Sequence, residues 1–163
     1  DGGEIKFGGV DVDSINTDEL LKNVTMVSQT TYLFDETIED NLRIAKPDAT
    51  QEEIEAACRM ASVHEFILSL PDGYKTRVGA LGDNLSAGEK QRIGLARAFL
   101  RGSEWILLDE PTSNVDSINE GIILKALQAQ KRKKSILLVS HRESTMAIAD
   151  RIYRVKDGRM AEI

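Results

Sequence analysis

Two short runs of the sequence contain four consecutive apolar residues followed by polar ones. "WILLDE" spans residues 105–110, and "SILLVSH" spans residues 135–141. A strand with successive apolar residues has no polar face to turn toward water, which is typical of strands buried on both faces of a parallel sheet. Helical patterns separate the strand candidates, so we predict an α/β domain with a mostly parallel sheet.

Local signals mark the helices and turns around these strands. Apolar residues recur at helical spacing in three segments, residues 50–70, 86–101 and 118–127. Thr50 with Glu53, and Ser86 with Glu89, match the capping box, in which two side chains satisfy backbone N–H groups at a helix start. Gly8-Gly9 and Asp157-Gly158 are the turn pairs of two predicted β-hairpins.

Polar side chains follow each strand candidate at the point where the strand ends. Gln29 closes "VTMVSQ", residues 24–29, while Asp109 and Glu110 close the second strand and His141 follows the third. Ligands of parallel α/β sheets bind beyond the carboxyl ends of the strands. A glutamine, an acid pair and a histidine at this edge therefore indicate one shared site.

The acid pair has a functional and a structural interpretation. Adjacent carboxylates at a sheet edge suit Mg²⁺ and phosphate chemistry, because Asp109 can hold the metal while Glu110 polarises a water molecule. His141 could hydrogen-bond a phosphate or orient that water. The alternative is a solvated acidic turn before Pro111, with His141 as a core or surface residue.

Ser86 and Gly88 also admit two interpretations. Ser86 could act only as a helix N-cap, but a helix start is also an anion site, with free N–H groups and the positive end of the dipole. Gly88 would let the backbone approach a ligand closely. We interpret His64, Cys58 and "KRKK", residues 131–134, as structural: a helix residue, a core thiol and a solvated turn.

Composition limits the class of protein. The 163 residues are enough for one domain with a core, and the net charge of −6 argues against nucleic acid as the main partner. The single cysteine cannot form an internal disulfide, which fits a reducing compartment. The longest apolar runs are too short to span a bilayer.

Taken together, these segments resemble the nucleotide-binding domain of an ABC transporter. "LSAGEKQR", residues 85–92, is similar to the signature motif LSGGQ with its basic continuation, and "WILLDE" is similar to the Walker B strand. "SNVD", residues 113–116, is similar to the D-loop, while Gln29 matches the Q-loop glutamine and His141 the switch histidine. The motifs follow in the family's order and spacing, and the resemblance covers essentially the whole chain.

The resemblance implies ATP as ligand and Mg²⁺ as cofactor, with a role for each residue at the sheet edge. Glu110 and His141 would be catalytic: the first polarises the attacking water and the second braces the γ-phosphate. Asp109 and Gln29 would serve the metal. The expected fold is a partial P-loop NTPase fold, mostly a parallel sheet with a small helical subdomain.

The family also implies a partner, because two such domains sandwich two ATP molecules. Ser86 and Gly88 would contact the γ-phosphate that a second nucleotide-binding domain holds. The other nucleotide-facing positions that the motifs imply are Gln29, Leu85, Ala87, Glu89 and Asp116. Ala87 replaces the second glycine of the signature, and Glu89 replaces its glutamine. As a capping-box acid, Glu89 is expected to turn back toward its own helix start.

Two further segments are similar to exporter-type domains. "YLFDETIEDNL", residues 32–42, has the exporter pattern, and "TRVGALG", residues 76–82, is similar to the segment that contacts coupling helices of the transmembrane domains. That segment usually carries Glu where this chain has Arg77. The resemblance implies an ATPase subunit of an exporter at the cytoplasmic face of the cell membrane.

The phosphate-binding Walker A motif, G-x-x-x-x-G-K-[ST], does not occur in these 163 residues. The chain therefore resembles the C-terminal portion of the domain. We expect the chain alone to be inactive, and its sheet centre to expose apolar surface that favours self-association. Its expected parts are a β part with the Q-loop (1–30), a helical subdomain with the signature (about 31–95) and a core with Walker B, D-loop and switch histidine (96–163).

Two other functions remain open. A non-transport ABC ATPase of the DNA-maintenance kind needs a long coiled coil between Q-loop and signature, but only a few dozen residues separate Gln29 from Ser86. A non-catalytic or degenerate module that donates its signature in trans would be compatible with the missing Walker A motif.

Overall fold

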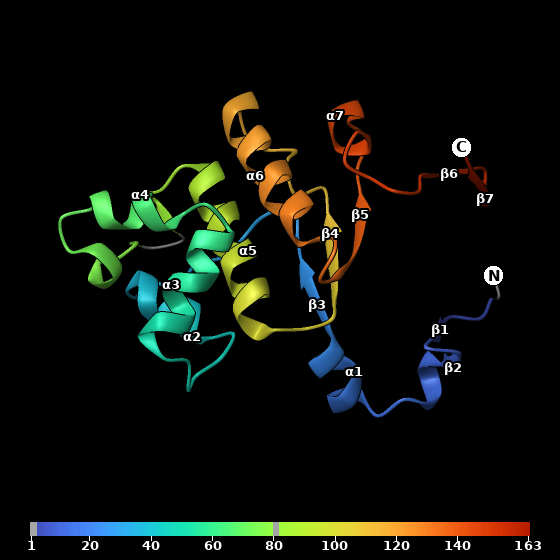
Figure 1. The fold of residues 1–163 in the computed structure, drawn as a ribbon, viewed down its shortest axis with the longest axis horizontal. Helices are drawn as coiled ribbons and strands as arrows, with labels where there is room; N and C mark the ends of the chain where they lie inside the picture. Colours follow the sequence, from blue (N-terminus) through green and yellow to red (C-terminus); the bar gives the residue numbers. More distant parts are fainter. Residues whose placement is uncertain (1–2, 80–81) are drawn as a thin grey trace.

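A central parallel sheet of three strands organises the computed structural model, which describes residues 3–79 and 82–163 (Figure 1). The strands are β3 (Val24–Val27), β4 (Trp105–Asp109) and β5 (Ser135–Val139), in the order β3-β4-β5. All three lie in segments that the sequence predicts as strands. Their parallel pairing confirms the predicted α/β class.

Helices and two hairpins complete the chain. The helices are α1 (Thr17–Asn23), α2 (Ile38–Arg43), α3 (Gln51–Met60), α4 (His64–Ser69), α5 (Ala87–Arg101), α6 (Ser117–Gln130) and α7 (Glu143–Met146), with 3₁₀ turns η1 (Val12–Ser14) and η2 (Gly73–Lys75). The antiparallel hairpins, both predicted, pair β1 (Lys6–Phe7) with β2 (Val10–Asp11) and β6 (Tyr153–Lys156) with β7 (Arg159–Glu162). Within the described ranges, no helix combines the length and the apolar character needed to cross a membrane.

Both predicted capping boxes are present. The Glu53 N–H donates to the Thr50 hydroxyl, and the Thr50 N–H donates to the Glu53 carboxylate at 3.0 Å; the same pair of bonds starts α5. The predicted helical segment 50–70 is not continuous. α3 ends at Met60 and α4 begins at His64, because Ser62 adopts a left-handed φ of 56° that a helix cannot contain.

One face of the sheet forms the core. α5 and α6 both lie on this side (Figure 1). The inward side chains Val27, Ile106 and Leu108 are buried there, together with Ile93 of α5 and Ile123 of α6. Because removing apolar surface from water stabilises a fold by about 25 cal/mol per Å², this layer of helices on strands is a main source of stability.

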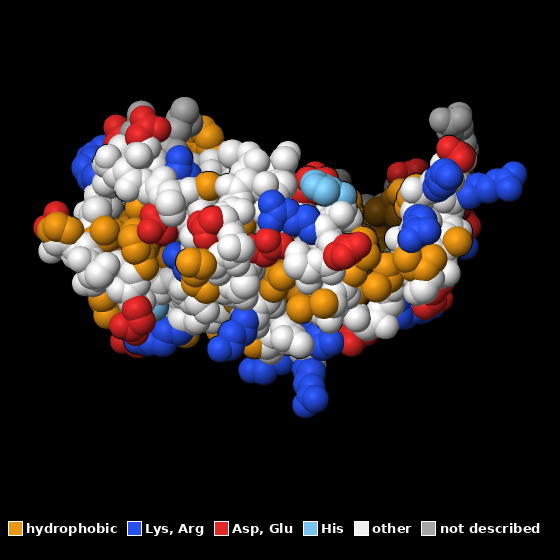
Figure 2. Space-filling view, turned by 90° about the horizontal axis from the view of Figure 1, so that it is seen from above, with side chains coloured by type: hydrophobic (Ala, Val, Ile, Leu, Met, Phe, Trp, Pro, Cys, Tyr) orange, Lys and Arg blue, Asp and Glu red, His pale blue; other side chains and the backbone are white. Residues whose placement is uncertain are grey.

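The opposite face of the sheet is open, which corrects one prediction. The "SILLV" strand is predicted to be buried on both faces, but Leu137 and Val139 are each 55% exposed and Met26 of β3 is 63% exposed. β5 lies at the sheet edge, and helices cover only its other face. Leu107 pairs with Met26 and Leu137, so these side chains form one apolar surface. Hydrophobic side chains also lie open near the terminal hairpins (Figure 2).

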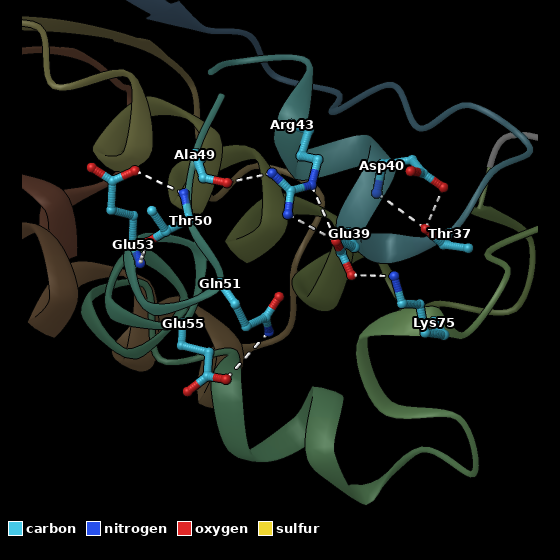
Figure 3. A network of polar contacts seen from close by, with 10 residues as sticks. All are labelled: Thr37, Glu39, Asp40, Arg43, Ala49, Thr50, Gln51, Glu53, Glu55 and Lys75. Atoms are coloured by element: carbon cyan, nitrogen blue, oxygen red, sulfur yellow. Dashed lines mark hydrogen bonds and ion pairs between the residues drawn. The ribbon is translucent and has the colours of Figure 1, made fainter. Parts of the chain in front are cut away.

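A polar network joins α2, α3 and η2 on the far side of α5 (Figure 3). Glu39 of α2 accepts hydrogen bonds from Arg43 and pairs with Lys75 of η2 at 2.7 Å, while Arg43 also donates to the Ala49 carbonyl before α3. The hydrogen bond from Lys75 is the main reason that the pKa of Glu39 lies below its usual value. The network fixes the helical region against η2.

α5 links this helical region to the sheet. It is continuous through residue 95, where the sequence places the boundary between helical subdomain and core, and it packs against both α3 and β3. The division of the chain at residues 30 and 95 stays a prediction. The position of α5 makes it the element through which the two regions are connected.

Candidate functional site

Glu110 and His141 meet at the carboxyl edge of the sheet. β4 and β5 are paired in register up to Asp109 and Val139, so the residues that follow the two strands are neighbours. His141 Nδ1 lies 3.0 Å from Glu110 Oε1. Both side chains reach solvent. The structure therefore brings together the two residues that the sequence predicts as catalytic.

The backbone of Glu110 is strained where this contact forms. Its φ is 44°, in the left-handed region, which costs a non-glycine residue about 1–3 kcal/mol. The Glu110 N–H donates to the Val139 carbonyl at 2.9 Å, and the Ser113 hydroxyl donates to the Glu110 carbonyl at 3.0 Å. These bonds hold the sharp bend that turns the carboxylate toward His141.

Gln29 lies in a bend directly after β3 and is exposed. It lines a hollow of about 140 Å³ together with Ala87 at the start of α5 and Pro111 after β4. Asp109, also exposed, ends the adjacent strand. The hollow thus lies between the loop after β3, the turn after β4 and the start of α5.

The oxygen atoms at this edge fit Mg²⁺ only in combination with phosphate. Among residues 3–79 and 82–163, no three His, Cys, Asp or Glu side chains form a cluster that could hold a metal ion. Mg²⁺ in nucleotide sites is held by one or two protein oxygens, with substrate phosphates and waters as the other ligands. The Asp109 carboxylate and the Gln29 amide oxygen match that limited requirement.

The start of α5 has the predicted geometry. The Ser86 N–H donates to Glu89 Oε2 at 2.7 Å, so the Glu89 carboxylate turns back to its own helix start, as expected. Ser86 and Ala87 are exposed, whereas the Leu85 side chain is part of the hydrophobic core. Leu85 thus anchors the helix start, and the exposed positions remain available to a ligand.

Gly88 has a packing role that the sequence does not reveal. A Cβ atom at this position would come within 3.0 Å of Asn119 Cγ on α6, closer than van der Waals contact allows. The Asn119 amide donates to Asp116 Oδ2 at 2.6 Å, and Asp116 caps α6. These hydrogen bonds, first those from Asn119, lower the pKa of Asp116. Asp116 is therefore committed to a helix cap beside the signature.

Arg142 is a residue near the site that sequence reasoning missed. Its guanidinium donates to Glu120 Oε2 at 2.5 Å and to the Ser113 carbonyl at 3.2 Å. The Ser144 hydroxyl donates to the other oxygen of Glu120. Arg142 thus fastens the turn after His141 to the loop 113–116 and to α6. Its position beside His141 is the one sequence signal that could have pointed to it.

His64 and Cys58, both interpreted as structural, behave as expected. His64 is buried, and its Nδ1 lies 2.8 Å from the Tyr74 hydroxyl. Cys58 is also buried, and the loss of hydration raises the pKa of its thiol to about 11. A thiol with this pKa is protonated at neutral pH, so Cys58 is a core residue without reactive character.

Comparison with known proteins identifies the family. The family model described as ABC transporter matches residues 1–113. The chain is 57% identical over 159 residues to a protein of Haemophilus influenzae named "Probable ABC transporter ATP-binding/permease protein", covering 98% of this chain and 29% of that protein. The chain belongs to the ABC transporter family. The motif assignments made from the sequence therefore concern a member of the expected family.

Further ABC relatives support the same conclusion. The multidrug resistance protein pgp-1 of Caenorhabditis elegans is 45% identical over 161 residues, which cover 99% of this chain and 12% of that protein. The solved structure of a bacterial Atm1-family ABC exporter with ATP bound has a TM-score of 0.90 and 35% identity, covering 99% of this chain and 28% of that one. The chain has the fold of the matched part of this ABC exporter and spans less than a third of the length of each of these relatives.

Proposed function

We propose that the chain forms part of the ATP-binding and ATP-hydrolysing domain of an exporter-type ABC transporter. The observation that carries this proposal is the pair at the sheet edge, with His141 Nδ1 3.0 Å from Glu110 Oε1. Support comes from the relatives, whose names describe ATP-binding/permease proteins and an exporter. ATP hydrolysis at the domain would power transport across the membrane that holds the permease part.

The contact between Glu110 and His141 suggests a role for each side chain in the reaction. We assign the hydrogen of the Glu110–His141 contact to His141 Nδ1, because a carboxylate without a proton can only accept a hydrogen bond. The other oxygen of Glu110 can then accept a hydrogen bond from the attacking water and polarise it.

Asp109 and Gln29 are proposed to hold Mg²⁺ together with the phosphates of ATP. The ion would neutralise negative charge that develops on the transferred phosphoryl group. The fit rests on the side-chain oxygens of Asp109, which ends β4, and of Gln29, which follows the adjacent strand β3 and lines the hollow next to Pro111.

Ser86, Ala87 and Gly88 are proposed to face nucleotide bound to a second ABC domain. The N-terminus of α5, a 15-residue helix, directs backbone N–H groups and the positive end of its dipole outward. Ser86 Oγ accepts from the Glu89 N–H, so its own proton is available to an anion. An ABC domain that pairs with another in this way has a complete site only in the dimer.

A second surface suits the membrane domain. An open groove of about 560 Å³ lies along the loop before α2 and along α2 itself; its lining residues are Phe34, Asp35, Glu36, Asp40, Asn41 and Ile44. Arg77 Nη2 donates to the Asp35 carbonyl at 2.7 Å, so the predicted contact segment 76–82 runs beside the groove; residues 80 and 81 of that segment lie outside the described residues. We propose that a coupling helix of the transmembrane domain binds here, at the cytoplasmic face.

A second candidate function is a module that contributes the signature surface in trans without hydrolysing ATP itself. The observation that favours it is the fully formed start of α5, where Ser86 and Ala87 are exposed. Both functions place the helix start against a partner's nucleotide, but only the first requires Glu110.

Substitution of Glu110 in the full-length protein separates the two functions. Glu110→Gln removes the base but keeps the size of the side chain, so we expect ATP turnover to fall about 100-fold or more. Glu104→Gln is the matched control, since Glu104 is an exposed acid before the same strand. The ATP turnover of this variant should equal that of wild type. Unchanged turnover in Glu110→Gln would favour the non-catalytic module.

A further inference from the structure

One stripe of α5 faces the loop that follows Gln29. Gln91, Gly94 and Arg97 recur at every third position, so they lie along one side of the helix. The Gln91 amide donates to the Ser28 carbonyl at 3.1 Å and accepts from the Thr31 hydroxyl at 2.9 Å. This face of the signature helix is therefore bonded to the loop rather than only packed against it.

Gly94 brings the loop and the helix unusually close. A Cβ atom there would come within 3.0 Å of Thr31 Oγ1, so any larger residue would push the loop away from α5. The close approach is what allows the next residue of the stripe, Arg97, to reach the backbone on the far side of the loop.

Arg97 spans this contact with all three nitrogens. Nε donates to the Asn41 carbonyl at 2.7 Å, Nη1 to the Tyr32 carbonyl at 2.6 Å and Nη2 to Asn41 Oδ1 at 2.6 Å. No carboxylate pairs with it in the described ranges. Burial lowers the pKa of Arg97 to about 10, so the group stays charged at neutral pH and the three oxygens are its counterpart.

Asn41 connects Arg97 to the loop that lines the groove. Its side chain is fully buried, and its amide donates to the carbonyls of Phe34 and Thr37 at 3.0 Å each. Asn41 Oδ1 accepts from the Phe34 N–H at 2.9 Å as well as from Arg97. Every hydrogen-bonding position of this amide is occupied, so Asn41 fixes the shape of the loop that lines the groove.

We propose that Arg97 and Asn41 are positioning residues that lock the groove of residues 34–44 to the signature helix. A displacement of a segment bound in the groove is then passed through α5, a continuous helix, to Ser86 at its start. This inference rests on the proposed function, because it assumes that a segment binds in the groove and that nucleotide binds at the start of α5. Neither residue belongs to the positions proposed to face ATP, and the hydrogen bonds of both go to residues other than Glu110 and His141.

The geometry of the Arg97 guanidinium predicts which substitutions disrupt its contacts with Tyr32 and Asn41. A lysine keeps the charge but is a point donor, so Arg97→Lys cannot serve three oxygens of two residues in fixed directions. Arg101→Lys is the matched control: Arg101 lies one turn further on the same helix and donates to the Leu21 carbonyl, away from the groove. Both variants preserve the net charge.

Hydrogen exchange in the full-length protein tests the lock. Without nucleotide, we expect exchange at residues 34–43 to quicken at least threefold in Arg97→Lys and to match wild type in Arg101→Lys, while residues 51–60 of α3 stay unchanged in both. With Mg-ATP, we expect slower exchange at 34–43 in wild type and Arg101→Lys, and at most half of that response in Arg97→Lys at equal nucleotide occupancy. A full response in Arg97→Lys would overturn the inference.

One further variant tests the inference if the first does not fold. If Arg97→Lys does not fold, Thr31→Val replaces it. This variant removes the hydroxyl that donates to Gln91, in the same contact between the loop and α5, and should weaken the response of residues 34–43 to Mg-ATP. An unchanged response would overturn the inference. Failure of wild type to bind Mg-ATP would contradict the proposed function alone, since the nucleotide-free exchange at residues 34–43 still tests the lock.

Discussion

Single residues in this domain combine a structural role with a predicted functional role. Gly88 lies in the predicted signature segment, yet its missing side chain is explained by the contact with Asn119. Asp116, at the predicted D-loop position, caps α6 and accepts from that same Asn119. The start of α5 and the start of α6 are thus joined within one chain, before any nucleotide or partner domain is considered.

The contact at Gly88 predicts a loss of stability on enlargement. Gly88→Ala forces a methyl group against Asn119, so we expect the free energy of unfolding of the 163-residue chain to fall by about 1–3 kcal/mol in urea. Gly121→Ala on α6 is the control, because nothing lies within 4 Å of its added Cβ. That variant should gain roughly 0.5–1 kcal/mol from helix propensity. Equal effects of both alanines would rule out the packing role.

At the scale of elements, the sequence was most informative where structure is local. The capping boxes at Thr50 and Ser86 and the hairpin turns depend on residues a few positions apart, and all are confirmed. The exposure of Leu137 could not be predicted, because it depends on what covers the far face of β5. The same holds for Arg97, whose acceptors lie more than fifty residues away in the sequence.

The network around Glu39 predicts a dependence on pH. The folded-state pKa of Glu39 is lowered, chiefly by Lys75, so its contribution to stability is present above the unfolded pKa near 4.5 and is lost as pH falls through the folded value. Between pH 6 and pH 3, we expect wild type to lose up to about 1 kcal/mol more stability than Glu39→Gln in urea unfolding. Identical pH curves for the two proteins would contradict this role.

For the whole molecule, the open sheet face is the dominant feature. Met26, Leu107 and Leu137 form an apolar surface on the side without helices, and β3 and β5 are the outer strands of the sheet among the described residues. The sequence predicted apolar surface at an open sheet centre, whereas β3, β4 and β5 pair directly and the exposed apolar side chains lie on one face of the sheet. Such surfaces and strand edges favour association.

Self-association of the 163-residue chain should therefore be measurable. We expect light scattering at about 100 μM to show dimers or larger species, because burying Leu137 and Val139 against another chain removes their apolar surface from water. Leu137→Lys with Val139→Lys should give a monomer. Ile118→Lys, at an exposed apolar position on α6, should leave the association unchanged. A wild-type chain that stays monomeric would show that the open face does not drive association.

The central claim is that Glu110 and His141 act as one unit in ATP hydrolysis, and a double-mutant cycle on ATP turnover of the full-length protein tests it most directly. Residues that act as a unit are strongly non-additive, so Glu110→Gln, His141→Ala and the double variant should each lower turnover by a similar factor, about 100-fold or more. Losses that multiply in the double variant would mean that the two residues act independently, and the contact at 3.0 Å would then not be the reaction centre.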